Sequence, residues 1–229
     1  MDIDIIIVED QPLFAELLTI GLDGRRLGSS TIHVLGSYRT ASQALSASPS
    51  QSCDVALLDY HLGPGPTGLE LGRTLRERRP KMGVVLLSQY RTPDLLKVLP
   101  PNEMSGWGYL IKQSATNIDT VIRTIVHVHN GLFVVDPSLA ELLQPIPNSP
   151  IATLTVRQRH ILTLMAEGYS NYAIAAQLSL AEKSVENQIT QIYHHLGIVR
   201  DGQIHSRVAA TRLFLHTSHV VDPTVRPSP

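Results

Sequence analysis

The sequence predicts an α/β fold, a flavodoxin-like doubly wound (βα)5 domain, followed by a small all-α domain of four helices. Short apolar runs alternate with amphipathic segments over the first 130 residues, whereas the pattern is helical throughout from residue 154. The stretch between these two regions is rich in proline. The chain has 229 residues, 43% of them hydrophobic and 17% charged, which suits two globular domains.

The first region, residues 1–130, contains five runs rich in Val, Ile and Leu that predict parallel strands. Amphipathic segments near 12–23, 40–47, 67–79, 92–99 and 115–129 predict helices on both faces of the sheet. In a doubly wound sheet, ligands bind at the carboxyl ends of the strands. The runs are IDIIIV (3–8), IHVLG (32–36), DVALLD (54–59), VVLLS (84–88) and YLI (109–111).

The residues that end these strands are polar. Glu9 and Asp10 follow the first strand, Asp59 ends the third, Ser88 ends the fourth and Lys112 follows the fifth. Three converging carboxylates repel one another and favour a hard cation such as Mg²⁺. Asp59 can then act as a nucleophile towards phosphorus, while Lys112 and Ser88 bind the phosphoryl oxygens. Each residue also has a plain structural explanation, but the five together favour this chemistry.

Four segments resemble a response-regulator receiver domain: VEDQPLF (8–14), DVALLDYHL (54–62), VVLLSQY (84–90) and GYLIKQS (108–114). The resemblance implies that Asp59 is the phosphoacceptor and that a sensor histidine kinase donates the phosphoryl group. It also implies that Asp10, Asp59 and the backbone carbonyl of His61 bind Mg²⁺, with Glu9 acting through water. Ser88 and Tyr109 would be the switch residues, although a tyrosine at the position of Tyr109 is, taken alone, more often plain strand packing.

Proline marks the expected domain boundary. Pro100-Pro101 must end the predicted helix near 92–99, because proline removes a helical hydrogen-bond donor. Residues 131–153 contain four prolines, and we expect their PIPNSP core (145–150) to be neither helix nor strand. Residues 131–153 are therefore predicted to be a linker.

The second domain is predicted to span residues 154–218, with a C-terminal tail at 219–229. Thr155 and Gln158 form a capping-box pattern at the start of LTVRQRHILTLMAEG, which Gly168 ends. A short helix, SNYAIAAQL, follows with Ser170 as its N-cap. The third helix, AEKSVENQITQIYHHLG (181–197), is closed by Gly197, and SRVAATRLFLHT (206–217) is the fourth.

This helical region resembles the LuxR-type helix-turn-helix of the NarL/FixJ group. The resemblance implies that residues 181–197 include the recognition helix, that double-stranded DNA is a partner, and that the phosphorylated protein forms a homodimer. It depends on Leu154-Thr155, Arg157-Gln158, Ala166, Gly168, Ser170-Asn171, Ile174-Ala175, Leu178, Ser184-Val185, Asn187 and Leu196-Gly197.

The DNA-facing residues depart from the usual pattern. Tyr172 and Ala173 stand where lysine and glutamate are usual, Glu186 replaces a usual lysine, and we expect no lysine beside it. Ala181 replaces a usual serine, so the recognition-helix cap is expected to shift to Ser179. The candidate base contacts are Glu186, Asn187 and Thr190, and the candidate anchors and other contacts are Ser170, Asn171, Lys183, Ser184, Arg200 and Arg207.

Composition and charge limit the classes of function that are compatible with the chain. The net charge is -1, and residues 149–229 carry only seven basic against five acidic side chains, so no global charge signature marks nucleic-acid binding. The lone Cys53 excludes an intramolecular disulfide and a cysteine-based zinc site. The run IDIIIV is too short for a membrane span, so we expect a cytoplasmic protein without a membrane partner.

The sequence suggests three hypotheses for the function. The leading hypothesis is a phosphorylation-controlled DNA-binding transcription regulator, which is not an enzyme. A dehalogenase-type phosphatase with Asp59 as nucleophile needs a second acid two residues later, where His61 stands, so that alternative fails. A regulator that has lost DNA binding and acts through protein contacts remains open, because the recognition helix is acidified. A gel-shift assay with a selected DNA pool separates the first hypothesis from the third.

Overall fold

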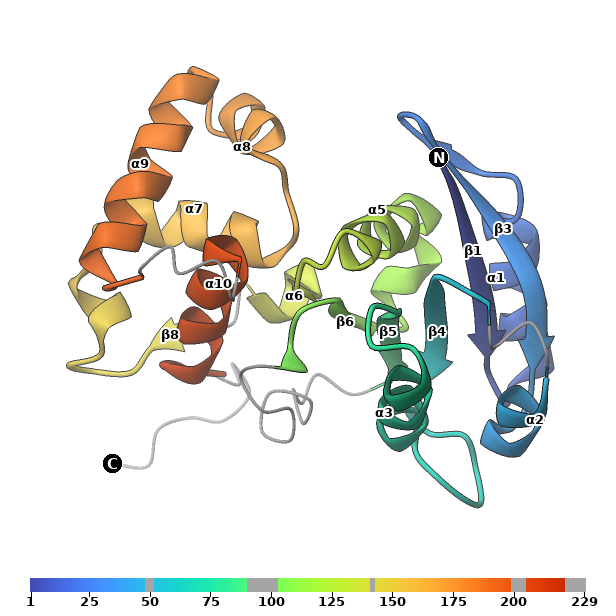
Figure 1. Cartoon of the computed structure of the whole chain (residues 1–229). Coiled ribbons are helices and arrows are strands. Elements are labelled where there is room, and N and C mark those ends of the chain that lie inside the picture. The colour runs from blue at the N-terminus through green and yellow to red at the C-terminus, as the bar shows by residue number, and fades with distance from the viewer. Residues whose placement is uncertain (48–51, 90–102, 141–142, 199–204, 221–229) are drawn as a thin grey trace. The chain divides into compact units, whose positions relative to one another are not determined.

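The computed structural model describes residues 1–47, 52–89, 103–140, 143–198 and 205–220, which form two units (Figure 1). The first unit ends at Val134. The second unit starts at Val135, apart from residues 103–104, which also belong to it. The helix expected near 92–99, its Pro100-Pro101 stop and Arg200 lie outside the described residues. Within the described ranges, no helix has the length and apolar character needed to cross a bilayer.

The first unit is built on a seven-stranded sheet in the order β2-β3-β1-β4-β5-β6-β7. Neighbours from β3 to β6 are parallel, and β2 pairs antiparallel with β3. The parallel strands therefore have the order of a flavodoxin-like fold, as predicted. The two short outer strands, β2 and β7, were not predicted. The strands are β1 (Asp2–Val8), β2 (Arg26–Leu27), β3 (Ser30–Tyr38), β4 (Val55–Asp59), β5 (Gly83–Ser88), β6 (Trp107–Ile111) and β7 (Val134–Val135).

Side chains cap the starts of several helices of this unit. Thr67 and Glu70 form a capping box at the start of α3, and Asn117 caps α5. Gly68 is needed at the first position of α3, because a Cβ there would lie 2.1 Å from the carbonyl oxygen of Asp59. The helices are α1 (Pro12–Leu22), α2 (Ala41–Ser46), α3 (Gly68–Arg78) and α5 (Ile118–His129), with a short 3-10 helix, η3, at Ser114–Thr116.

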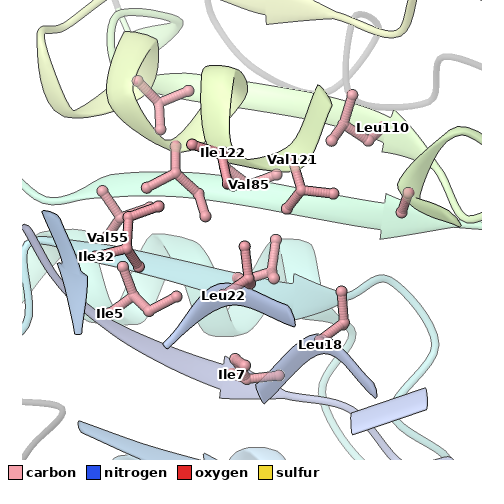
Figure 2. Close-up of a cluster of buried hydrophobic side chains, with 14 of the residues drawn as sticks. Ile5, Ile7, Leu18, Leu22, Ile32, Val55, Val85, Leu110, Val121 and Ile122 are labelled. Carbon is pink, nitrogen blue, oxygen red and sulfur yellow. The ribbon is translucent and has the colours of Figure 1, made fainter. Parts of the chain in front are cut away.

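The main core lies between the sheet and helices α1 and α5. Figure 2 shows Ile5 and Ile7 of β1 facing Leu18 and Leu22 of α1 within this cluster. The intervening residue Ile6 is buried as well, although it points to the other face of β1. Because helices cover both faces, β4 and β5 are apolar up to the polar residues that end them, Asp59 and Ser88.

The second unit contains the four predicted helices, α7 (Val156–Ala166), α8 (Asn171–Gln177), α9 (Glu182–His195) and α10 (Ser206–His216). Thr155 and Gln158 make the predicted capping box, and Ser170 caps α8. Gly168 and Gly197 have left-handed backbones, with φ values of 85° and 66°, which ends the helices before them as predicted. The other elements are α6 (Pro137–Ala140), β8 (Leu143–Pro145), η4 (Pro150–Thr153) and β9 (Ser218–Val220).

The PIPNSP segment is more regular than predicted. Pro145 ends β8, which pairs antiparallel with β9, so part of the expected C-terminal tail is strand. A two-stranded ribbon has an open edge on each strand, where a missing N–H is tolerated. Pro150 opens the 3-10 helix η4, where its N–H would have no helical partner in any case.

The predicted cap of the recognition helix was wrong. Ser179 has φ 53° and lies in the turn between α8 and α9, where the Leu180 N–H donates to the Ala175 carbonyl at 2.8 Å. Helix α9 begins after Ala181, which makes no side-chain capping bond. Because Ser179 belongs to the turn that closes α8, it does not cap α9, and α9 starts without the stabilisation of a side-chain cap.

Candidate functional site

The residues predicted to form the phosphoacceptor site meet at the carboxyl edge of the sheet. The Lys112 ammonium donates to Asp59 Oδ2 at 2.8 Å and to Glu9 Oε1 at 2.9 Å. Glu9 Oε2 lies 2.8 Å from the same ammonium, although it accepts no hydrogen bond among the described residues. The backbone N–H of His61 donates to Asp59 Oδ1 at 3.1 Å, and that of Gln11 donates to Glu9 Oε1 at 3.2 Å. One lysine therefore links two acids from different strands.

Strand register brings these residues to one level. Asp59 lies opposite Leu87 of β5, and Ser88 lies opposite Ile111 of β6. The Lys112 N–H donates to the Ser88 carbonyl at 2.7 Å, which continues the ladder one residue past β6. Because the strands are parallel, their ends meet at the same edge of the sheet.

Burial sets the electrostatics of this site. The Glu9 side chain is fully buried and that of Lys112 is only 10% exposed. Loss of water raises the pKa of Glu9 to about 7, against the opposing effect of its hydrogen bond with Lys112. Burial by itself lowers the pKa of Lys112, but the bonds to Asp59 and Glu9 outweigh it and raise that pKa. The Lys112 ammonium also lies 5.1 Å from the ring centroid of Phe14.

The acids can hold a metal ion. Glu9, Asp10 and Asp59 each offer a carboxylate oxygen, and these oxygens lie within 4.8 Å of one another. Asp10 is exposed, whereas the other two are buried. A set of hard oxygen donors with an excess of negative charge suits Mg²⁺. The buried Glu9 Oε2, without a hydrogen bond among the described residues, is consistent with such an ion.

The two predicted switch residues are both buried. Ser88 ends β5 at the level of the site, 2% exposed, and Tyr109 lies inside β6 opposite Leu86, 3% exposed. The structure thus brings Ser88 to the acids and lysine, while it places Tyr109 in the sheet, where both the switch role and plain packing fit.

In the second unit, a groove of about 840 Å³ lies along α9 and contains most of the predicted DNA contacts. Ser170 and Ser184 are exposed but do not line it. Tyr193, His205 and Ser206 were not predicted; the helical spacing from Lys183 through Thr190 identifies Tyr193 as a member of the same face. The lining residues are Asn171, Lys183, Glu186, Asn187, Ile189, Thr190, Tyr193, His205, Ser206 and Arg207.

The expectation that no lysine stands beside Glu186 was wrong. The Lys183 ammonium donates to Glu186 Oε2 at 2.9 Å, three residues along α9. The Thr190 hydroxyl donates to the Glu186 carbonyl at 3.0 Å. Sequence spacing permits the pair at i and i+3, but the rotamer of an exposed lysine is not encoded locally. The predicted phosphate anchor is thus engaged by the acid next to it.

The Arg207 guanidinium is hydrogen-bonded to other residues of the protein. Its Nη1 donates to Asn171 Oδ1 at 3.1 Å, and its Nη2 donates to the Tyr169 carbonyl. Burial lowers the pKa of Arg207 from its usual value. Elsewhere in the helical unit, His195 Nε2 lies 2.9 Å from the Thr153 hydroxyl.

Two family models match the chain. The response regulator receiver domain matches residues 5–123, and the luxR family of bacterial regulatory proteins matches residues 152–214. The first match contains every residue of the phosphoacceptor site, and the second contains the groove.

Several relatives match the chain over most of its length. The DNA-binding transcriptional activator DevR/DosR of Mycobacterium tuberculosis is 29% identical over 188 residues, covering 80% of this chain and 83% of that protein. A nitrate/nitrite response regulator protein homolog of Haemophilus influenzae is 27% identical over 214 residues, covering 92% and 95%. The RcsB response regulator of Salmonella typhimurium has the same fold, with a TM-score of 0.52, 20% identity and coverage of 88% and 95%.

Proposed function

Since the chain belongs to the NarL/FixJ family of response regulators, with a receiver domain and a LuxR-type DNA-binding domain, we propose that phosphorylation of Asp59 controls its binding to double-stranded DNA. The observation that carries the proposal is the Lys112 ammonium, held at 2.8 Å from Asp59 and linked to Glu9 at the sheet edge. The matched families are transcription regulators rather than enzymes, and the phosphoryl donor is a sensor histidine kinase. We place this reaction in the cytoplasm.

The phosphoryl transfer is a displacement at phosphorus. A carboxylate oxygen of Asp59 attacks the phosphorus of the kinase phosphohistidine, and a P–O bond forms as the P–N bond breaks. The imidazole leaves with the electron pair of that bond, and Asp59 becomes an acyl phosphate. Bound at Glu9, Asp10, Asp59 and the His61 carbonyl, Mg²⁺ would offset negative charge on the phosphoryl oxygens.

The residues around Asp59 respond to its phosphorylation. Lys112 neutralises charge on the transferred group, and the Ser88 hydroxyl donates to one of its oxygens. Ser88 ends β5, the strand next to that of Asp59, and Lys112 follows β6 and already donates to Asp59 Oδ2 at 2.8 Å, so the reaction needs only short movements there. Tyr109 changes rotamer when Ser88 is engaged, which alters the surface of the receiver.

The helical unit supplies the response. Helix α9 enters the major groove and presents Asn187, Glu186 and Thr190 to base edges, while Lys183, Ser170 and Ser184 lie on or near its phosphate-facing side. Phosphorylation raises the homodimer fraction, and the dimer binds two half-sites about one helical turn apart.

The Lys183–Glu186 pair favours one alternative, a regulator that acts through protein contacts without DNA. An exposed lysine that is already paired provides less attraction for phosphates. A gel-shift assay with a selected DNA pool decides between the two functions: a retained duplex supports the first, and absence of any retained duplex supports the second.

Labelling tests the phosphoacceptor directly. With Mg²⁺ and a small phosphodonor, the full chain should take up one acid-stable, base-labile phosphoryl group. Asp59→Asn should abolish the label, whereas Asp119→Asn, which changes an exposed acid at the start of α5, should retain it. Full labelling of the Asp59→Asn variant would refute the assignment.

A further inference from the structure

One cationic side chain of the groove along α9, that of Arg207, is hydrogen-bonded to the protein itself. Arg207, in the first turn of α10, lines the groove, yet both ends of its guanidinium donate to residues at the start of α8 and just before it. One bond reaches the side-chain oxygen of Asn171 at 3.1 Å, and the other reaches the backbone carbonyl of Tyr169. The planar fork of an arginine can serve two such acceptors at once.

The chemistry of Arg207 fixes the orientation of the Asn171 amide. A guanidinium has donors only, so the group that faces it must be the amide oxygen. The NH₂ group of Asn171 therefore points away from Arg207. Among the residues that the structure describes, that NH₂ has no hydrogen-bond partner, and Asn171 lines the same groove as Lys183 and Asn187.

This orientation limits what Asn171 can recognise. Asparagine reads adenine with two bonds, in which its oxygen accepts from N6 and its NH₂ donates to N7. The Asn171 oxygen faces Arg207 and accepts from it, so the NH₂ group is the part of the amide that is turned away from the arginine. A group that only donates suits a phosphate oxygen, which only accepts.

We propose that Arg207 is a positioning residue for DNA binding, which holds Asn171 so that its NH₂ group donates to a DNA phosphate. Arg207 itself makes no phosphate contact in this arrangement, contrary to the role expected from the sequence. The inference rests on the proposed DNA-binding function. It assigns different roles to two groove residues: Arg207 positions Asn171, and Asn171 contacts the phosphate.

A double-mutant cycle in the full-length chain tests the proposal with a duplex selected from a random pool. Arg207→Lys keeps the positive charge but loses the fork, so it should weaken binding about fivefold to tenfold. Asn171→Ala should weaken binding about tenfold, as expected for a lost bond to a charged group. The double variant should bind no more than about twofold worse than Asn171→Ala, because the two residues act through one bond to phosphate.

The matched control is Arg212→Lys, on the same helix but outside the groove lining, which should bind like the wild type. A second measurement uses Arg207→Gln, which removes the charge. If Arg207 only positions Asn171, the slope of log affinity against log salt should stay the same. A direct phosphate anchor would instead make it shallower by about 0.9.

Three results would overturn the inference. Arg207→Lys binding like the wild type would show that the charge, not the fork, matters. Losses that multiply in the double variant would mean that Arg207 acts independently of Asn171, as a purely structural residue would. A shallower salt slope for Arg207→Gln would identify a phosphate anchor. If the wild-type chain retains no duplex from the pool, the proposed function itself fails, which is a different outcome from these three.

Discussion

Lys112 and Lys183 each pair with a glutamate, but the two pairs lie in opposite surroundings. The Lys112 side chain is 10% exposed and that of Glu9 is fully buried, whereas Lys183 and Glu186 are 79% and 44% exposed. Charges attract more strongly where water is excluded, and a solvated pair contributes little to stability. The first pair is therefore part of the framework of the phosphoacceptor site, while the second is an adjustable feature of the groove.

The largest expected difference between the two pairs is in stability. Lys112→Met leaves the buried carboxylates of Glu9 and Asp59 without their cation, and should lower the free energy of unfolding by about 3–5 kcal/mol. Lys183→Met should change it by less than about 0.5 kcal/mol. Urea unfolding with a metal chelator present measures both. Equal effects would contradict the contrast drawn between the pairs.

A smaller effect is expected in the pH dependence of stability without metal. The pKa of Glu9 is raised from 4.5 to about 7 in the folded chain, chiefly by burial. The folded state therefore binds more protons than the unfolded state in this range, and stability falls as the pH rises from 4.5 to about 7. The contribution should be on the order of 3 kcal/mol.

Thermal unfolding in chelator at several pH values tests this contribution, with Glu9→Gln as the comparison. The glutamine cannot ionise, so the variant should lose most of the decline between pH 4.5 and 7. A wild-type chain that instead gains stability over this interval would show that Lys112 outweighs burial at Glu9.

The smallest expected effect concerns the exposed pair. Glu186→Gln frees Lys183 for a phosphate and should steepen the salt slope of DNA binding by up to about 0.9 for each protomer. Glu186→Lys adds a further cation, so its slope should be steeper still, with weaker discrimination among sequences. Glu182→Gln, an exposed acid of the same helix outside the groove lining, is the control. Slopes equal to that of the wild type would mean that this face of α9 does not contact DNA.

The fold and the meeting of the candidate phosphoacceptor residues at one sheet edge were predictable because both depend on local signals. Apolar runs identified the five central strands, and the polar residues that end them met at one edge because parallel strands share their direction. Capping residues such as Thr155 and Ser170 identified the helices of the second unit. These features need only spacing and residue type.

The errors concern features that depend on partners far along the chain or on side-chain direction. Strands β8 and β9 are three residues each and pair across more than 70 positions, so no local pattern indicates them. Arg207 and Asn171 lie 36 residues apart, and only their contact shows that the arginine is engaged. The Lys183–Glu186 bond depends on a rotamer, and Ser179 on a turn that competes with capping.

The central claim is that phosphorylation of Asp59 controls DNA binding. The most direct test measures the affinity of the full chain for a duplex with two half-sites about one helical turn apart, before and after treatment with a phosphodonor and Mg²⁺. The wild-type chain should bind more tightly after treatment, and the Asp59→Asn variant should not respond. An unchanged affinity in a wild-type chain that is shown to be phosphorylated, or an equal gain in Asp59→Asn, would contradict the account.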